Sequence, residues 1–66
     1  MTVTVNGASL DVPEDTTLES VVASLGLADG PAATEVNRRL VSKRARAALV
    51  LHEGDRVEVV TLVGGG

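Results

Sequence analysis

The glycines that close the sequence, Gly64, Gly65 and Gly66, follow directly on an apolar, strand-like run that ends at Val63. Glycine has no Cβ, so a glycine segment is flexible and passes through spaces that any other residue would block. The reactive group that such a segment can present is the terminal carboxylate on Gly66. We therefore expect 64–66 to form a flexible tail that threads this carboxylate into the active site of another protein.

Side chains that commonly carry out catalysis are scarce in this sequence. It contains no cysteine and one histidine, His52, so a nucleophile and a base are hard to pair. Neither a Gly-x-Gly-x-x-Gly turn nor a phosphate-binding loop is present. Because His52 adjoins the turn Glu53-Gly54-Asp55, we interpret it as a solvated turn residue and not as a general base. These observations argue against an enzyme.

Two charged clusters each admit a structural and a functional interpretation. An acidic run near the expected helix start interacts favourably with the helix dipole, and a metal site there is a remote alternative. A basic cluster is interpreted as a solvated surface, with electrostatic steering toward an acidic partner as the alternative. The acidic residues are Asp11, Glu14, Asp15 and Glu19, and the basic residues are Arg38, Arg39, Lys43, Arg44 and Arg46.

Composition restricts the class of protein further. A chain of 66 residues makes one domain, and without Phe, Tyr or Trp its core must consist of Val, Leu and Ala. The net charge of −3 and the missing aromatic stacking platforms argue against nucleic-acid binding. No apolar stretch approaches the ~20 residues of a membrane span, and no signal peptide precedes the first alternating segment. We expect a cytoplasmic protein that does not bind membranes.

The elements that must position the tail follow from hydrophobic periodicity, beginning with a hairpin. Polar and apolar residues alternate over 2–5 and again over 8–12, on either side of Asn6-Gly7. This dipeptide favours a type I′ turn, which needs positive φ at both central residues. The side chains expected to point inward are Val3, Val5, Leu10 and Val12.

A short helix is predicted over 17–25. The segment Thr16-Thr17-Leu18-Glu19 matches a capping box, in which Thr16 caps the helix and Glu19 reaches back to it. Gly26 is placed as the residue that ends the helix. The apolar stripe expected to pack on a sheet consists of Leu18, Val21, Val22 and Leu25.

Further strands follow the helix. We expect a third strand at 33–36, a turn at 37–39, a short return strand at 40–41 and a last strand at 56–63. The polar and basic stretch 42–48 is either a single helical turn or a loop. A hairpin, a helix and then further strands indicate an α+β domain, 1–63, with one main helix packed on one face of a single sheet.

The last strand has two different faces. Val57 and Val59 alternate with Glu58, so the uncharged set is the better candidate for the core. Val60 and Leu62 then lie on the open face of the sheet, and with Val63 they form a candidate partner-binding patch beside the tail. Scattered exposed apolar residues are also common on protein surfaces, and the adjacent tail is what favours the patch.

Taken together, these parts resemble the ThiS/MoaD family of sulfur carriers in the ubiquitin-like superfamily, and the likeness is to its ThiS-like members. The likeness covers the whole length of the sequence. The sequence differs from the family at two places. The stretch 42–46 lacks the Pro and the downstream Trp that often follow the short strand, and Gly64 is an additional glycine. The residues that carry it are the helix ending Leu25-Gly26, the segment Val36-Asn37-x-x-Leu40-Val41, the turn Glu53-Gly54-Asp55-Arg56-Val57 and the glycine tail.

This resemblance implies a β-grasp fold, with a mixed sheet of four to five strands, and a function as protein co-substrate. A ThiF-like adenylyltransferase would use MgATP to adenylate the carboxylate of Gly66, with Gly64 and Gly65 threaded into its site. A sulfur donor such as a cysteine desulfurase would then supply the sulfur of a terminal thiocarboxylate. The sulfur would pass to a ThiG-like thiazole synthase for thiamine biosynthesis. The carrier itself is expected to bind no cofactor.

Other functions stay open at this stage. A carrier for molybdopterin, cysteine or thiosugar assembly would share the fold and the tail. The molybdopterin branch tends toward longer chains with aromatic residues. A ubiquitin-like modifier would use the same adenylate to form an isopeptide bond with a lysine. A plain interaction domain would tolerate loss of Gly65 and Gly66.

Overall fold

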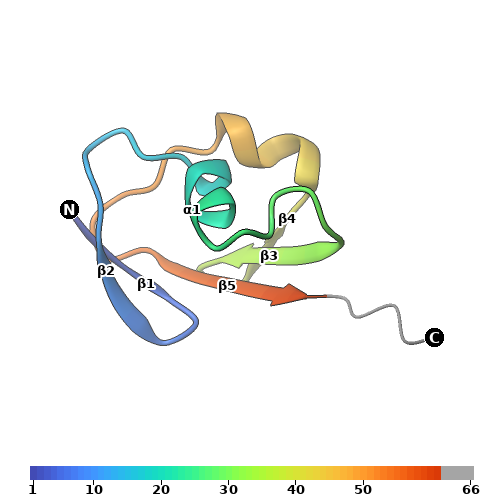
Figure 1. Cartoon of the computed structure of the whole chain (residues 1–66). Helices are drawn as coiled ribbons and strands as arrows, with labels where there is room; N and C mark the ends of the chain where they lie inside the picture. The colour runs from blue at the N-terminus through green and yellow to red at the C-terminus, as the bar shows by residue number, and fades with distance from the viewer. Residues whose placement is uncertain (62–66) are drawn as a thin grey trace.

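The computed structural model of this protein describes residues 1–61, which form five strands, one α-helix and one 3₁₀ helix (Figure 1). The helices are α1 (Leu18–Ser24) and the 3₁₀ helix η1 (Lys43–Ala48). The strands are β1 (Thr2–Val5), β2 (Ala8–Asp11), β3 (Ala32–Val36), β4 (Arg39–Val41) and β5 (Arg56–Thr61).

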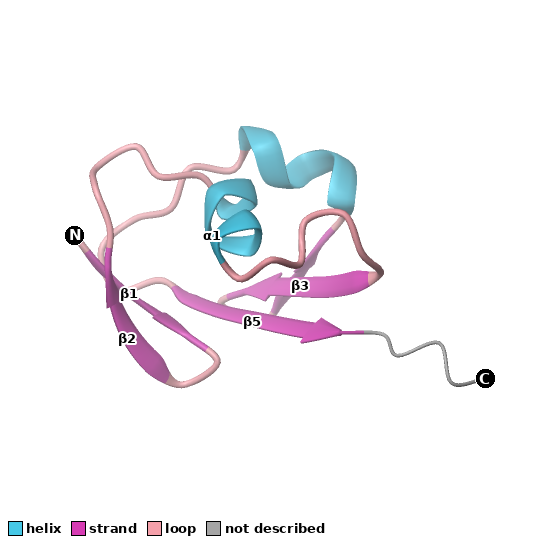
Figure 2. Ribbon diagram, in the orientation of Figure 1, coloured by secondary structure: helices cyan, strands magenta, loops and turns pink. Residues whose placement is uncertain are grey.

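The strands form one mixed sheet in the order β2-β1-β5-β3-β4. The central strand β5 runs parallel to β1 and antiparallel to β3, whereas the two outer pairs are antiparallel hairpins. Both helices lie on the same side of this sheet (Figure 2). The α+β class and the mixed sheet with one main helix, predicted from the sequence, are confirmed.

The hydrophobic core lies between the sheet and α1. It is built from valine and leucine, as the composition requires, and the alternation in β5 places Val57 and Val59 in it as predicted. Within residues 1–61, no helix has both the length and the apolar character needed to cross a bilayer. The buried apolar residues are Val3, Val5, Leu18, Val21, Val22, Val36, Leu51, Val57 and Val59.

Both hairpins turn through left-handed residues. Asn6 and Gly7 have φ values of 51° and 85°, which confirms the predicted tight turn. Asn37 and Arg38 take the same conformation, with φ values of 53° and 70°, so this second turn is two residues long and Arg39 already belongs to β4. Asparagine tolerates this conformation better than most residues because its short polar side chain bonds locally.

The start of α1 differs from the predicted capping box. Thr17, one residue later than expected, is the cap, and its side-chain oxygen accepts a hydrogen bond from the backbone N–H of Ser20. The Thr16 hydroxyl instead donates to the carbonyl of Pro13. Glu19 does not reach back to the cap but pairs with a residue of η1. Tertiary contact therefore overrides the local capping pattern at this helix.

Two residues expected to point inward are exposed. Leu10 is 37% exposed because β2 is an outer strand and α1 packs over the sheet's centre. Leu25 is exposed because the helix ends at Ser24, although Gly26 has the positive φ expected of a residue that ends a helix.

The stretch 42–48, for which the sequence allowed a loop or a helical turn, is largely the 3₁₀ helix η1. The division into a 1–63 domain and a 64–66 tail stays a prediction, since 62–66 lie outside the described residues.

Candidate functional site

The candidate site begins where β5 ends. Thr61, the last described residue, belongs to the central strand of the sheet and is paired with Ala32 at the start of β3. The pairing of β5 with β1 ends earlier, at Val57, so β3 is the strand beside Thr61. The predicted tail residues Gly64, Gly65 and Gly66 lie outside the described residues, and their role stays a prediction.

The side chain of Asn6 holds the second half of β5. Its Oδ1 accepts a hydrogen bond from the backbone N–H of Val59 at 2.8 Å, and its Nδ2 donates to the carbonyl of Val59 at 3.2 Å. The residue-by-residue pairing of β1 with β5 ends at Val5 and Val57. The Asn6 amide therefore takes the place of a further strand residue and satisfies both backbone groups of Val59. Sequence reasoning identified Asn6 as a turn residue and missed this contact.

A second turn asparagine holds the beginning of β5. The Asn37 Oδ1 accepts a hydrogen bond from the backbone N–H of Arg56 at 3.0 Å, and its Nδ2 donates to Oδ1 of Asp55 at 3.0 Å. Asp55 also accepts the backbone N–H of His52, and Glu53 accepts that of Thr2. The motif residues Val36-Asn37 and Glu53-Gly54-Asp55 thus have a structural function: they fix the strand that delivers the tail.

The open face of β5 carries the predicted patch. Val60 is 56% exposed and its strand partner is Ala33, so the face predicted for this residue is confirmed. The other two predicted members of the patch, Leu62 and Val63, lie outside the described residues. Whether Val60 binds a partner stays a prediction.

Two carboxylates face one another on this open side. Glu58 of β5 is directly opposite Glu35 of β3, and Glu35 is in turn opposite Leu40 of β4. Within residues 1–61 neither glutamate makes an ion pair. Like charges directly opposite each other destabilise a sheet, so this arrangement costs stability in the free protein. The open face therefore combines an apolar part around Val60 with a negative pair.

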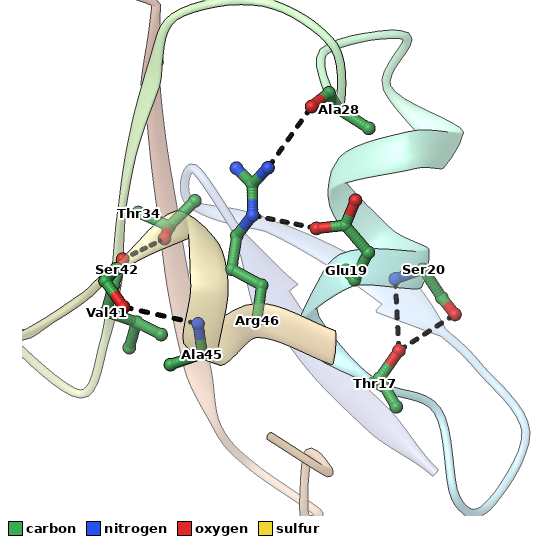
Figure 3. A network of polar contacts seen from close by, with 9 residues as sticks. All are labelled: Thr17, Glu19, Ser20, Ala28, Thr34, Val41, Ser42, Ala45 and Arg46. Atoms are coloured by element: carbon green, nitrogen blue, oxygen red, sulfur yellow. Dashed lines mark hydrogen bonds and ion pairs between the residues drawn. The ribbon is translucent and has the colours of Figure 1, made fainter. Parts of the chain in front are cut away.

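The interpretation of the basic cluster as a solvated surface is wrong for Arg46. Its side chain has no exposed surface, and its Nε lies 2.8 Å from Oε1 of Glu19 in α1 (Figure 3). Its Nη2 donates to the carbonyl of Ala28 at 3.3 Å. This guanidinium joins η1 to α1 and to the loop that follows α1. The other members, Arg38, Arg39, Lys43 and Arg44, are exposed as expected.

The remaining titratable residues that the sequence analysis singled out make separate local contacts within residues 1–61. The His52 side chain is exposed, as predicted, with its Nδ1 4.0 Å from Oδ2 of Asp55. In the acidic run, Asp11 accepts from the Thr2 hydroxyl and Glu14 pairs with the N-terminal ammonium. Across residues 1–61, no group of three or more His, Cys, Asp or Glu side chains is arranged to hold a metal ion.

Comparison with known proteins gives one family. The model of the ThiS family matches residues 2–66. The crystal structure of the thiamine biosynthesis protein ThiS from Geobacter metallireducens superimposes with a TM-score of 0.81 at 29% identity, covering all of both chains. The solution structure of a thiamine biosynthesis protein from the same organism gives a TM-score of 0.78 at 29% identity, with 100% of this chain and 88% of that one covered.

Two curated relatives are longer proteins named thiazole synthase. The one from Magnetococcus marinus is 39% identical and the one from Paramagnetospirillum magneticum 30% identical, each over all 66 residues of this chain. The chain spans 20% of the length of either relative. A sequence of this kind therefore occurs within a polypeptide named for thiazole synthesis.

Proposed function

This chain belongs to the ThiS family, and we propose that it is the sulfur carrier of thiamine thiazole biosynthesis. The observation that carries the proposal is the match of the family model over residues 2–66, which includes the glycine tail. The fold agrees with it, because the ThiS structure from Geobacter metallireducens covers the whole chain. The chain would then act as a co-substrate that is consumed and regenerated, and not as a catalyst.

The reacting group in this proposal is the carboxylate of Gly66. A carboxylate is a poor acyl electrophile, so a partner adenylyltransferase first joins it to AMP, using MgATP and releasing pyrophosphate. A sulfur donor such as a cysteine desulfurase then supplies a persulfide, whose outer sulfur displaces AMP and forms an acyl disulfide. Attack by a further thiol on this disulfide releases the terminal thiocarboxylate and leaves a new disulfide between the two thiols. The nucleotide and its metal bind to the partner, and the carrier contributes the carboxylate and the Gly64-Gly65 segment that reaches it.

The acceptor of the sulfur is proposed to be a thiazole synthase. Support comes from the curated relatives, in which a sequence like this one makes up 20% of proteins named thiazole synthase. Two functions joined in one polypeptide meet at high effective concentration, so the joining indicates that they act in succession. Since activation consumes ATP, we place the reaction in the cytoplasm.

The open face of the sheet is the proposed contact with these enzymes. Val60 is exposed there, and the chain runs on from Thr61 toward the tail. An enzyme that binds this face contacts the chain next to the start of the tail. It can then position the Gly66 carboxylate at its own active site. Leu62 and Val63 extend the same proposal to residues between the sheet and the glycines.

Intact mass tests the function. The protein is isolated from its own host and weighed before and after alkylation. A species heavier by the exchange of one oxygen for one sulfur, mapped to a peptide ending at Gly66, is the expected result. An unmodified mass after incubation with ATP, a sulfur source and the host's adenylyltransferase would overturn the carrier function. A stable conjugate with a lysine of another protein would indicate a modifier instead.

A further inference from the structure

Most of the basic charge gathers along one edge of the molecule. The chain has six Lys and Arg residues and a net charge of −3. Arg46 is buried and Arg56 begins the central strand, whereas the other four lie in or beside β4 and η1. Within residues 1–61, none of these four makes an ion pair. The four are Arg38, Arg39, Lys43 and Arg44, and all are exposed.

An apolar groove runs along the same edge. Two adjoining hollows of about 500 and 590 Å³ share Arg39, Val41 and Leu49 in their linings. Ala45 and Ala48 of η1 line the second hollow, so small side chains keep it open. We call the two hollows together the β4–η1 groove.

Part of the apolar lining of this groove stays exposed to solvent. Leu40 lines the second hollow and is 77% exposed, although it lies in a strand of the sheet. Val41 and Leu49 pack against the core but are only partly buried. Because β4 is the last strand in the sheet order, nothing in residues 1–61 pairs with its outer edge. Apolar surface rimmed by polar residues is typical of sites where proteins meet.

We propose that the β4–η1 groove docks an acidic segment of a partner protein, with an apolar side chain seated against Leu40, Val41 and Leu49. Charge complementarity identifies the occupant. Arg39 lines both hollows, and the exposed cations Lys43 and Arg44 belong to η1, whose alanines line the second. None of these three cations makes an ion pair within residues 1–61, although the chain as a whole is acidic. An aromatic platform for nucleic-acid bases is missing from the whole sequence. The inference rests on the proposed function for its partners, which are the adenylyltransferase and the thiazole synthase.

The groove meets the open face at Leu40, whose cross-strand partner is Glu35, but the two surfaces differ in charge. The open face carries the Glu35–Glu58 pair, whereas Arg39 lines both hollows of the groove and, within residues 1–61, Asp55 is the one carboxylate in their linings. A partner that presents carboxylates is attracted to Arg39 and the cations of η1 and repelled by the glutamates. The two surfaces together would therefore orient a partner as well as attract it, since like charges brought together suppress the wrong approach.

Binding kinetics test the docking site. Dissociation constants and association rates are measured between the full chain and each of the two purified enzymes from the same host. Leu40→Ser removes the apolar anchor and is expected to raise Kd on the order of tenfold for at least one enzyme. Arg39→Gln and Lys43→Gln are expected to slow association about threefold each at low salt, and the difference should vanish at about 0.5 M salt.

A matched control distinguishes the effect of charge at the groove from the effect of the net charge of the chain. Ala23→Glu lowers the net charge by the same one unit as Lys43→Gln, but at an exposed position of α1. The control should bind both enzymes like the unaltered chain. Unaltered binding of both enzymes by all three groove variants would overturn the proposal, and so would equal slowing by Ala23→Glu.

Failure of the docking proposal can be distinguished from failure of the proposed carrier function. Formation of the thiocarboxylate by the unaltered chain reports the proposed function whether or not the groove matters. If the unaltered chain binds neither enzyme, both proposals fail. If the chain dimerises in sedimentation and Leu40→Ser abolishes the dimer, the occupant is a second copy, and the proposed partner is wrong.

Discussion

The Nε atom of Arg46 lies 2.8 Å from Oε1 of Glu19, and this contact joins η1 to α1. Arg46 is fully buried, whereas the Glu19 side chain is 35% exposed. Loss of either partner therefore affects stability differently. The buried guanidinium depends on Glu19 for charge compensation, whereas the Glu19 carboxylate keeps access to water. Nη1 of Arg46 has no hydrogen-bond partner within residues 1–61. The contact with Glu19 therefore carries more of the stabilisation of this buried cation.

Removing the charge of Glu19 should cost more stability than removing that of Arg46. Glu19→Gln leaves a buried cation without its counter-charge, and we expect a loss of about 2 to 4 kcal/mol in the free energy of unfolding. Arg46→Met keeps much of the volume without the charge and should cost under about 1.5 kcal/mol. Urea denaturation measures both variants. Arg44→Met, an exposed neighbour in η1, is the control and should change stability by less than about 0.5 kcal/mol. The reverse order of the two losses would contradict the argument.

Loss of the Asn6 amide should loosen the end of β5. Asn6→Gly keeps the left-handed turn, since glycine takes a positive φ freely, but it removes both side-chain bonds to Val59. We expect a loss of about 1 to 2 kcal/mol in stability, and faster amide hydrogen exchange at Val59 in particular. Unchanged protection at Val59 would show that the contact does not hold the strand in solution.

Neutralising one member of the glutamate pair should stabilise the free protein. Glu58→Gln removes the repulsion from Glu35 across the strands and is expected to raise the free energy of unfolding by about 0.2 to 1 kcal/mol. The gain should shrink as salt screens the charges. Asp29→Asn, an exposed carboxylate outside the sheet, serves as the comparison. An equal gain in both variants would point to net charge as the cause.

Val60→Asp should weaken binding to the adenylyltransferase or the thiazole synthase without unfolding the domain. The side chain is exposed on the open face, so we expect a loss of stability of no more than about 1 kcal/mol. Val59→Asp, one residue earlier, places a charge in the core and should prevent folding. Thermal unfolding and calorimetric titration distinguish the two variants. Unaltered affinity of Val60→Asp for both enzymes would remove Val60 from the proposed contact.

Removal of Gly66 should abolish activation while the fold is retained. The reacting carboxylate would then be on Gly65, one residue too short to reach the adenylation site. ATP–pyrophosphate exchange catalysed by the adenylyltransferase measures the loss, and circular dichroism checks the fold. Exchange at the normal rate would show that the position of the carboxylate does not matter and would contradict the mechanism.

Local patterns in the sequence predicted the backbone well. The Asn6-Gly7 turn and the alternation through Val57 and Val59 are confirmed, and so is the apolar stripe of α1 except for Leu25, which is exposed. Each depends on residues that are neighbours in sequence, so its physical cause is visible there. The resemblance to the ThiS family is confirmed as well, because the family model matches residues 2–66.

Contacts between distant segments could not be predicted in this way. The cluster that contains Arg46 looks like a solvated surface, because nothing near it in the sequence indicates that Glu19 will meet it. The same holds for Leu10, whose exposure depends on which strand becomes the sheet's edge. The capping pattern at Thr16 failed because Glu19 had a stronger tertiary partner.

The sequence by itself determined which groups this protein can offer: a glycine segment, an apolar last strand, one histidine and no cysteine. Only the tertiary structure decided how they are held. It placed Asn6 and Asn37 along the strand that leads to the tail, buried Arg46 and left Arg39 exposed in the lining of an apolar groove. The reason is physical, since burial and charge pairing depend on the three-dimensional neighbours of a side chain, whereas backbone conformation is largely set by adjacent residues.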